Sequence, residues 1–151
     1  IELGGVLAAQ GQYPRALKCY RLARAQRPAN PDIAMRMGAV DDAQNDRAGA
    51  IENYRRAIRL DPDDWEAHFE LGGQLDAAGQ LNAALAEFAE ATRLDPGFSR
   101  THFNYGVLLA KLGRLDEAQR EFQETLRLEP GYKNALDSLQ KIAILKRENR
   151  N

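Results

Sequence analysis

The sequence predicts an all-α fold, built as a solenoid of antiparallel helix pairs, and three observations lead to this expectation. Residues of the same kind recur every 34 positions, and a fixed period of about 20 to 50 residues indicates a stacked repeat protein. Glycine or asparagine interrupts the helical pattern once in each period. The chain of 151 residues is 44% hydrophobic but only 7% aromatic, which favours close-packed helices rich in alanine and leucine.

Four kinds of residue carry the period. They are the prolines Pro28, Pro62, Pro96 and Pro130, the alanines Ala16, Ala50, Ala84 and Ala118, the glycines Gly4, Gly38, Gly72 and Gly106, and the aromatic residues Tyr20, Tyr54, Phe88 and Phe122. Proline closes each unit because it tolerates the first turn of a helix but not its interior. The small residues let the two helices of a repeat approach closely.

The helix boundaries follow from the residues that end helices. Gly11, Asn45, Gly79 and Gly113 lie where a left-handed backbone conformation is expected after a helix. We predict first helices over 1–10, 31–44, 64–78 and 98–112, second helices over 14–27, 47–60, 81–94 and 115–128, and a last helix over 132–148. Asp116 is expected to cap its helix, with Gln119 completing a capping box.

Two segments, FELGGQLDAAGQLNAALAEFAEATRLDP and FNYGVLLAKLGRLDEAQREFQETLRLEP, closely resemble the consensus of the tetratricopeptide repeat (TPR) family. The resemblance covers essentially the whole chain. It divides residues 1–151, a single array, into a partial repeat over 1–30, repeats over 31–64, 65–98 and 99–132, and a capping helix over 133–149. It implies a right-handed superhelix in which the first helices line a concave groove.

The second and fourth repeats depart from the TPR pattern. Asp41 occupies the slot that holds leucine in the other repeats, and Arg47 replaces the usual leucine or tyrosine after the turn. Thr125 stands where the other repeats have a small alanine.

The resemblance also implies that the groove binds an extended peptide or a helix of a partner protein. The candidate groove residues are Met35, Ala39, Asp42, Phe69, Gly73, Asp76, Phe103, Val107 and Lys111. Large apolar residues beside small ones form a shallow trough for an apolar side chain. In the alternative, Phe69 and Phe103 only pack between neighbouring first helices.

Charge in the groove is uneven. Asp42 and Asp76 are expected at its margins, with Lys111 toward the end, so that a basic or zwitterionic peptide would suit it. In the alternative, these charges only keep the surface soluble. The lysine, asparagine and arginine residues with which some TPR proteins clamp a C-terminal carboxylate are absent from these rows, which argues against that type of receptor.

The last helix carries more apolar residues than are needed to cap the preceding repeat. Ile144 and Leu145 extend its apolar surface toward the groove side. We expect this surface to contact a following segment of a longer protein, a second copy of the chain through self-association, or a ligand.

Composition excludes several other functions. With 21 basic and 22 acidic residues, the net charge of −1 gives no general attraction to nucleic acid or to an anionic membrane. No apolar stretch approaches the roughly 18 residues of a membrane-spanning helix, so we expect a soluble segment, with the cytoplasm favoured. Since the chain begins at Ile1 without a methionine, we expect it to be part of a longer protein.

The sequence favours a non-catalytic scaffold without metal or cofactor. His68 and His102 are one repeat apart, too far to share a metal ion, and a structural role is expected for both. Cys19 is the only cysteine, and no nucleotide-binding or metalloprotease motif occurs. Two alternatives remain open, the TPR portion of a larger enzyme such as a glycosyltransferase, and a self-assembling structural array.

Overall fold

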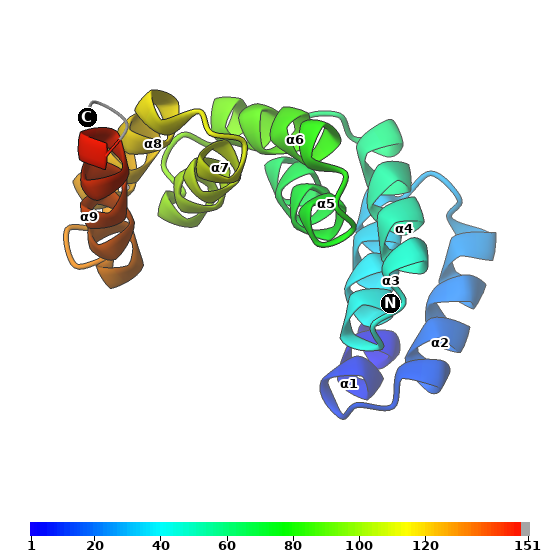
Figure 1. Cartoon of the computed structure of the whole chain (residues 1–151). Helices are drawn as coiled ribbons and strands as arrows, with labels where there is room; N and C mark the ends of the chain where they lie inside the picture. Colours follow the sequence, from blue (N-terminus) through cyan, green and yellow to red (C-terminus); the bar gives the residue numbers. More distant parts are fainter. Residues whose placement is uncertain (149–151) are drawn as a thin grey trace. The chain divides into compact units, whose positions relative to one another are not determined.

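The computed structural model describes residues 1–148, and within that range every regular element is an α-helix (Figure 1). The helices are α1 (Glu2–Ala9), α2 (Tyr13–Gln26), α3 (Pro31–Ala43), α4 (Arg47–Leu60), α5 (Trp65–Ala77), α6 (Leu81–Leu94), α7 (Ser99–Lys111), α8 (Leu115–Leu128) and α9 (Lys133–Glu148). Each predicted helix end lies within one residue of the observed one. The predicted all-α repeat fold is therefore confirmed. Position 149, the last of the expected capping helix, lies outside the described residues.

The chain forms two compact units, residues 1–74 (unit 1) and residues 75–151 (unit 2). In unit 1, α1 pairs with α2 and α3 with α4, and α2 also packs against α3. In unit 2, α7 pairs with α8, while α6 packs on α7 and α9 packs on α8. Helix α5 crosses the boundary between the two units. No described helix is both long enough and apolar enough to cross a membrane.

The turn within each repeat has the expected left-handed residue. The φ angles of Gly11, Asn45, Gly79 and Gly113 are 71°, 60°, 73° and 74°. After this residue the chain folds back, and the amide of the following residue donates to a carbonyl in the last turn of the helix. In the second repeat, Asp46 N–H donates to the Asp41 carbonyl at 2.8 Å. Glycine takes this backbone conformation without steric cost, and asparagine tolerates it better than most residues.

Contacts between glycine and an aromatic ring set the spacing within the helix pairs. A Cβ atom added to Gly38 would lie 2.7 Å from the Tyr54 ring, and one added to Gly106 would lie 2.8 Å from the Phe122 ring. Tyr54 and Phe122 are only 2% and 1% exposed. Each ring therefore lies directly against the first helix of its own repeat, where a larger residue would push the pair apart.

The predicted capping box at Asp116 is wrong. Helix α8 starts earlier, with Arg114 at the N-cap position and no side-chain hydrogen bond there. Asp116 lies inside the first turn, and its carboxylate accepts from Lys146 of α9 at 2.6 Å. Lys146 also donates to the Gln119 side chain at 2.6 Å. Asp116 and Gln119 thus connect α8 to α9, because both lie within α8 rather than at its N-cap position.

The departures from the repeat pattern are accommodated by hydrogen bonds. Asp41 is 7% exposed and accepts a hydrogen bond from the Asn53 side chain at 2.7 Å. Burial raises the pKa of Asp41, and the hydrogen bond from Asn53 opposes this shift. Thr125 is completely buried, and its hydroxyl donates to the Glu121 carbonyl at 2.9 Å. A polar residue thus occupies each slot without losing its hydrogen-bond partner.

Candidate binding site

The two phenylalanines of the predicted trough serve internal packing. Phe69 in α5 is 9% exposed. Phe103 in α7 lies with its ring centroid 5.6 Å from that of Phe122 and 4.9 Å from that of Tyr132. Both side chains therefore have the surroundings expected if they pack between helices. A contact of either ring with a ligand stays a prediction.

Unit 1 contains a pocket between its first helices α1 and α3, which we call the unit 1 pocket. Its volume is about 300 Å³, and its lining is Gly5, Ala8, Tyr13, Tyr20, Arg36, Ala39, Val40 and Ala43. Small residues leave the space open, and Ala39 is the one predicted groove residue that lines it. Arg36 is held by Asp32 at 2.9 Å, and this hydrogen bond, with a smaller contribution from Tyr20, raises the pKa of the guanidinium.

Unit 2 contains a pocket between α7 and α9, with α8 contributing one residue, which we call the unit 2 pocket. Its volume is about 270 Å³, and its lining is Val107, Ala110, Lys111, Phe122, Ser138, Lys141, Ile142 and Leu145. The structure therefore brings Val107 and Lys111, from the predicted groove, together with Leu145, from the predicted extra contact surface. Ile144 does not line it.

The two pockets are the same site in different repeats. Three periods of 34 residues, or 102 positions, separate their equivalent residues. This shift relates Gly5 to Val107, Ala8 to Ala110, Tyr20 to Phe122, Arg36 to Ser138, Ala39 to Lys141, Val40 to Ile142 and Ala43 to Leu145. The row Ala39, Gly73 and Val107 continues to Lys141 one period later, so that extending the row would have identified this lysine from the sequence.

The charges of the predicted groove are partly paired. The Lys111 ammonium contacts both carboxylate oxygens of Asp76, at 2.8 and 2.6 Å. The acidic margin in unit 2 is thereby neutralised, whereas Asp42 in unit 1 is exposed. Lys141 is also exposed and forms no ion pair with another described residue. Lys141 was not among the candidate residues predicted from the sequence.

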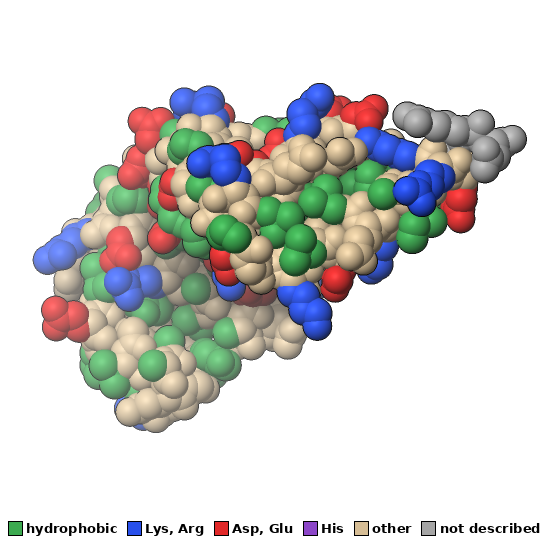
Figure 2. Space-filling view, turned by 90° about the vertical axis from the view of Figure 1, so that its left-hand side faces the viewer, with side chains coloured by type: hydrophobic (Ala, Val, Ile, Leu, Met, Phe, Trp, Pro, Cys, Tyr) green, Lys and Arg blue, Asp and Glu red, His purple; other side chains and the backbone are tan. Residues whose placement is uncertain are grey.

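Three large apolar side chains of α9 remain at the surface. Figure 2 shows a group of hydrophobic side chains on one face of the molecule, with basic and acidic side chains around them. Leu136, Ile144 and Leu145 are 44%, 55% and 45% exposed. The residues of the predicted extra contact surface are thus accessible, and their contact with a partner stays a prediction.

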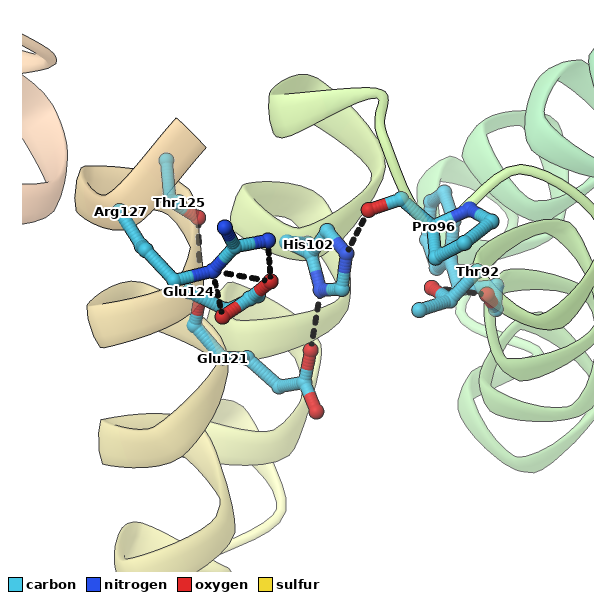
Figure 3. A network of polar contacts seen from close by, with 8 residues as sticks. Thr92, Pro96, His102, Glu121, Glu124, Thr125 and Arg127 are labelled. Carbon is cyan, nitrogen blue, oxygen red and sulfur yellow. Dashed lines mark hydrogen bonds and ion pairs between the residues drawn. The ribbon is translucent and has the colours of Figure 1, made fainter. Parts of the chain in front are cut away.

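His102 has both ring nitrogens in hydrogen bonds (Figure 3). Its Nδ1 lies 2.8 Å from a Glu121 carboxylate oxygen, and its Nε2 lies 3.1 Å from the Pro96 carbonyl. Both partners are acceptors, and the protonated ring, in which both nitrogens donate, satisfies both of them. The hydrogen bond to Glu121 raises the pKa of His102, although burial opposes this shift. The pair joins α7, α8 and the loop before α7.

His68 repeats part of this arrangement in unit 1. Its Nε2 lies 3.1 Å from the Pro62 carbonyl, six residues earlier, as His102 lies relative to Pro96. Both histidines are buried, at 8% and 6% exposure. Among the described residues, no group of three or more His, Cys, Asp or Glu side chains is arranged to hold a metal ion.

Comparison with known proteins agrees with the repeat geometry. A family model of the tetratricopeptide repeat matches residues 75–142, and a TPR repeat model matches residues 43–73. No curated protein matches the sequence.

Several solved structures have a similar fold. The crystal structure of MamA has a TM-score of 0.91 at 20% identity, covering 97% of this chain and 85% of that one. YrrB, described as a TPR protein with an unusual peptide-binding site, has a TM-score of 0.78 at 27% identity, covering 91% and 71%. The first TPR of Spaghetti (RPAP3), bound to an HSP90 peptide, has a TM-score of 0.73 at 20% identity, covering 76% and 91%.

Proposed function

Because this chain belongs to the tetratricopeptide repeat family, we propose that it is a non-catalytic scaffold for protein interactions. A peptide segment or a helix of a partner protein binds along the first helices, with side chains entering the pockets of each unit. The predicted groove residues Ala39, Val107 and Lys111 line these pockets.

The recurrence of one pocket in both units is the observation that carries this proposal. Seven residues of one lining have their equivalents in the other, three periods apart. The recurrence has a physical cause, since the Gly4–Tyr20 and Gly106–Phe122 contacts give both helix pairs the same spacing. Concave sites with apolar walls and few polar groups are the usual places where proteins bind ligands.

The solved relatives support a peptide as the ligand. YrrB has a peptide-binding site, and the first TPR of Spaghetti (RPAP3) is bound to an HSP90 peptide. Fold similarity alone does not identify a partner, so the residues of the pockets must supply the specificity.

Filling the pockets tests the proposal. Peptides selected from a random library against the 151-residue chain would be measured by fluorescence anisotropy against Ala39→Phe and Ala110→Phe. Each new ring occupies one pocket, and we expect at least one variant to weaken each selected peptide about tenfold, which corresponds to ~1.4 kcal/mol.

Matched controls place the same ring outside the pockets. Ala25 in α2 and Ala143 in α9 are exposed and line neither pocket. Ala25→Phe and Ala143→Phe should bind the peptides like the original chain, while circular dichroism shows that all four variants remain folded. Equal binding by all variants, or a library without any binder, would refute the proposal.

A further inference from the structure

We propose that the unit 2 pocket selects an apolar side chain that is flanked by carboxylates. The aliphatic or aromatic side chain of an acidic peptide segment enters the pocket, and a neighbouring carboxylate pairs with the ammonium of Lys141. This inference rests on the proposed function and names the chemistry of the partner at one of its two pockets.

The walls of the unit 2 pocket favour an apolar side chain. Val107, Ile142 and Leu145 face the cavity from α7 and α9. The one hydroxyl in the lining, that of Ser138, already donates to the Asn134 carbonyl at 2.7 Å. Apart from the two lysine ammonium groups, the walls offer a polar group little to replace the water that it would lose on entering, which costs free energy, whereas an apolar group gains from burial.

The charges of the lining are all positive. Lys111 and Lys141 line the pocket, and no carboxylate of the described chain does. Lys111 is already paired with Asp76, which leaves Lys141 as the cation available to a ligand. Asp137 lies one turn before Lys141 on α9 but forms no ion pair with it. A carboxylate beside the entering side chain is therefore attracted, and a basic segment is repelled.

The unit 1 pocket provides an internal contrast. Ala39 occupies the position of Lys141, so that the equivalent ammonium is missing there. Its own cation, Arg36, is held by Asp32 through two hydrogen bonds of 2.9 and 3.0 Å. The preference for flanking carboxylates should thus be confined to unit 2.

Three short peptides with capped ends test the inference. Each has a central leucine, flanked on both sides by glutamate, by serine or by lysine. Binding to the 151-residue chain would be followed by the NMR shifts of the Val107, Ile142 and Leu145 methyl groups. We expect the glutamate peptide to bind about two- to fivefold more tightly than the serine peptide, the range for a surface ion pair, with the lysine peptide weakest. Added salt should remove the difference.

A variant with the charge of Lys141 reversed tests directly whether this residue determines the order of peptide affinities. Lys141→Glu should reverse the order, so that the lysine peptide binds more tightly than the glutamate peptide. Lys133→Glu, on the same helix but outside the pocket, has the same net charge and should keep the original order. A fourth peptide with alanine between two glutamates should leave the pocket methyl groups unshifted.

The outcomes separate this inference from the proposed function. Equal affinity for the three leucine peptides, or an order that Lys141→Glu leaves unchanged, would overturn the selection for carboxylates while leaving the scaffold intact. Absence of any shift at the three methyl groups would also overturn it. The scaffold itself fails only if Ala39→Phe and Ala110→Phe bind library peptides normally or if the library yields none.

Discussion

Unit 1 and unit 2 place the same pocket at the same repeat positions but line it with different chemistry. Gly5, Ala8 and Ala39 surround a paired guanidinium in unit 1, whereas apolar side chains and two lysines surround the pocket of unit 2. Behind both pockets, a ring contacts a glycine at the same spacing. The buried contacts therefore determine where a pocket forms, and the residues that line it determine which ligand group it accepts.

The units differ in a second way, through their buried ionisable groups. Unit 1 has the Asp41–Asn53 hydrogen bond, and unit 2 has the His102–Glu121 ion pair. Asp41 occupies a position that holds leucine in the other repeats. The His102–Glu121 pair joins α7 to α8, and His102 also contacts the loop before α7. The pKa of Asp41 and the pKa of His102 are both raised, so pH should affect the stability of each unit.

The largest effect is expected where a ring contacts a glycine. Gly38→Ala in unit 1 and Gly106→Ala in unit 2 should each lower the free energy of unfolding by about 1–3 kcal/mol, because the new methyl group overlaps a buried ring. Urea unfolding followed by circular dichroism would measure it. Similar losses in both units would support a common framework, and a large loss in only one would contradict it.

Gly73→Ala is the matched control. Gly73 also lies inside a helix, but a Cβ atom there would find no neighbour within 4 Å. This variant should raise the free energy of unfolding by up to about 1 kcal/mol, because alanine favours the helix. If Gly73→Ala destabilised as much as Gly106→Ala, the ring contact would not be the cause.

The next effect concerns pH and the His102–Glu121 pair. The pKa of His102 is raised above 6.5 in the folded state, so its contribution is complete below about pH 6.5 and is lost as pH rises through the folded value. Glu121→Gln should lower the free energy of unfolding by about 1–3 kcal/mol at pH 6, with a smaller difference at alkaline pH. Urea unfolding across this range would test it, and a constant difference would contradict it.

Asp41 gives a second pH dependence, in unit 1. Burial raises its pKa above 3.8, so the stability it contributes is complete below about pH 3.8 and declines as pH rises through the folded value. Amide hydrogen exchange, measured unit by unit across pH, should place one change near Asp41 and another near His102. A single pH-dependent transition common to both units would contradict the assignment of separate changes to Asp41 and His102.

The smallest effect is expected at two buried threonines of unit 2. The Thr101 hydroxyl has no hydrogen-bond partner in the described part of the chain, and Ala67 and Ala135 fill the equivalent slot in other repeats. Thr101→Val should therefore raise the free energy of unfolding by about 1 kcal/mol. Thr125→Val should instead change it by less than about 1 kcal/mol, because it removes a hydrogen bond to Glu121 but leaves that carbonyl in the helix. Thermal unfolding would compare the stabilities of the two variants. Destabilisation by Thr101→Val would contradict the view that the Thr101 hydroxyl is buried without a hydrogen-bond partner.

Much of the fold could be predicted from the sequence because its determinants are local. The left-handed residues Gly11, Asn45, Gly79 and Gly113 end the helices wherever they occur. The 34-residue period identified both the ring positions and the small residues that contact them. The cap predicted at Asp116 was wrong because the helix begins at Leu115, which places Asp116 inside the first turn, where its carboxylate pairs with Lys146.

The sequence by itself determined the helices, their pairing and the rows of residues that share a register, because these depend on backbone preference and on a fixed period. Only the tertiary structure decided which members of a row face a cavity. Phe103 turns its ring toward Phe122 and Tyr132, while Lys111 pairs with Asp76 and Leu145 reaches the same pocket as Val107. Side-chain direction depends on the neighbours that occupy the space, and those neighbours come from other helices.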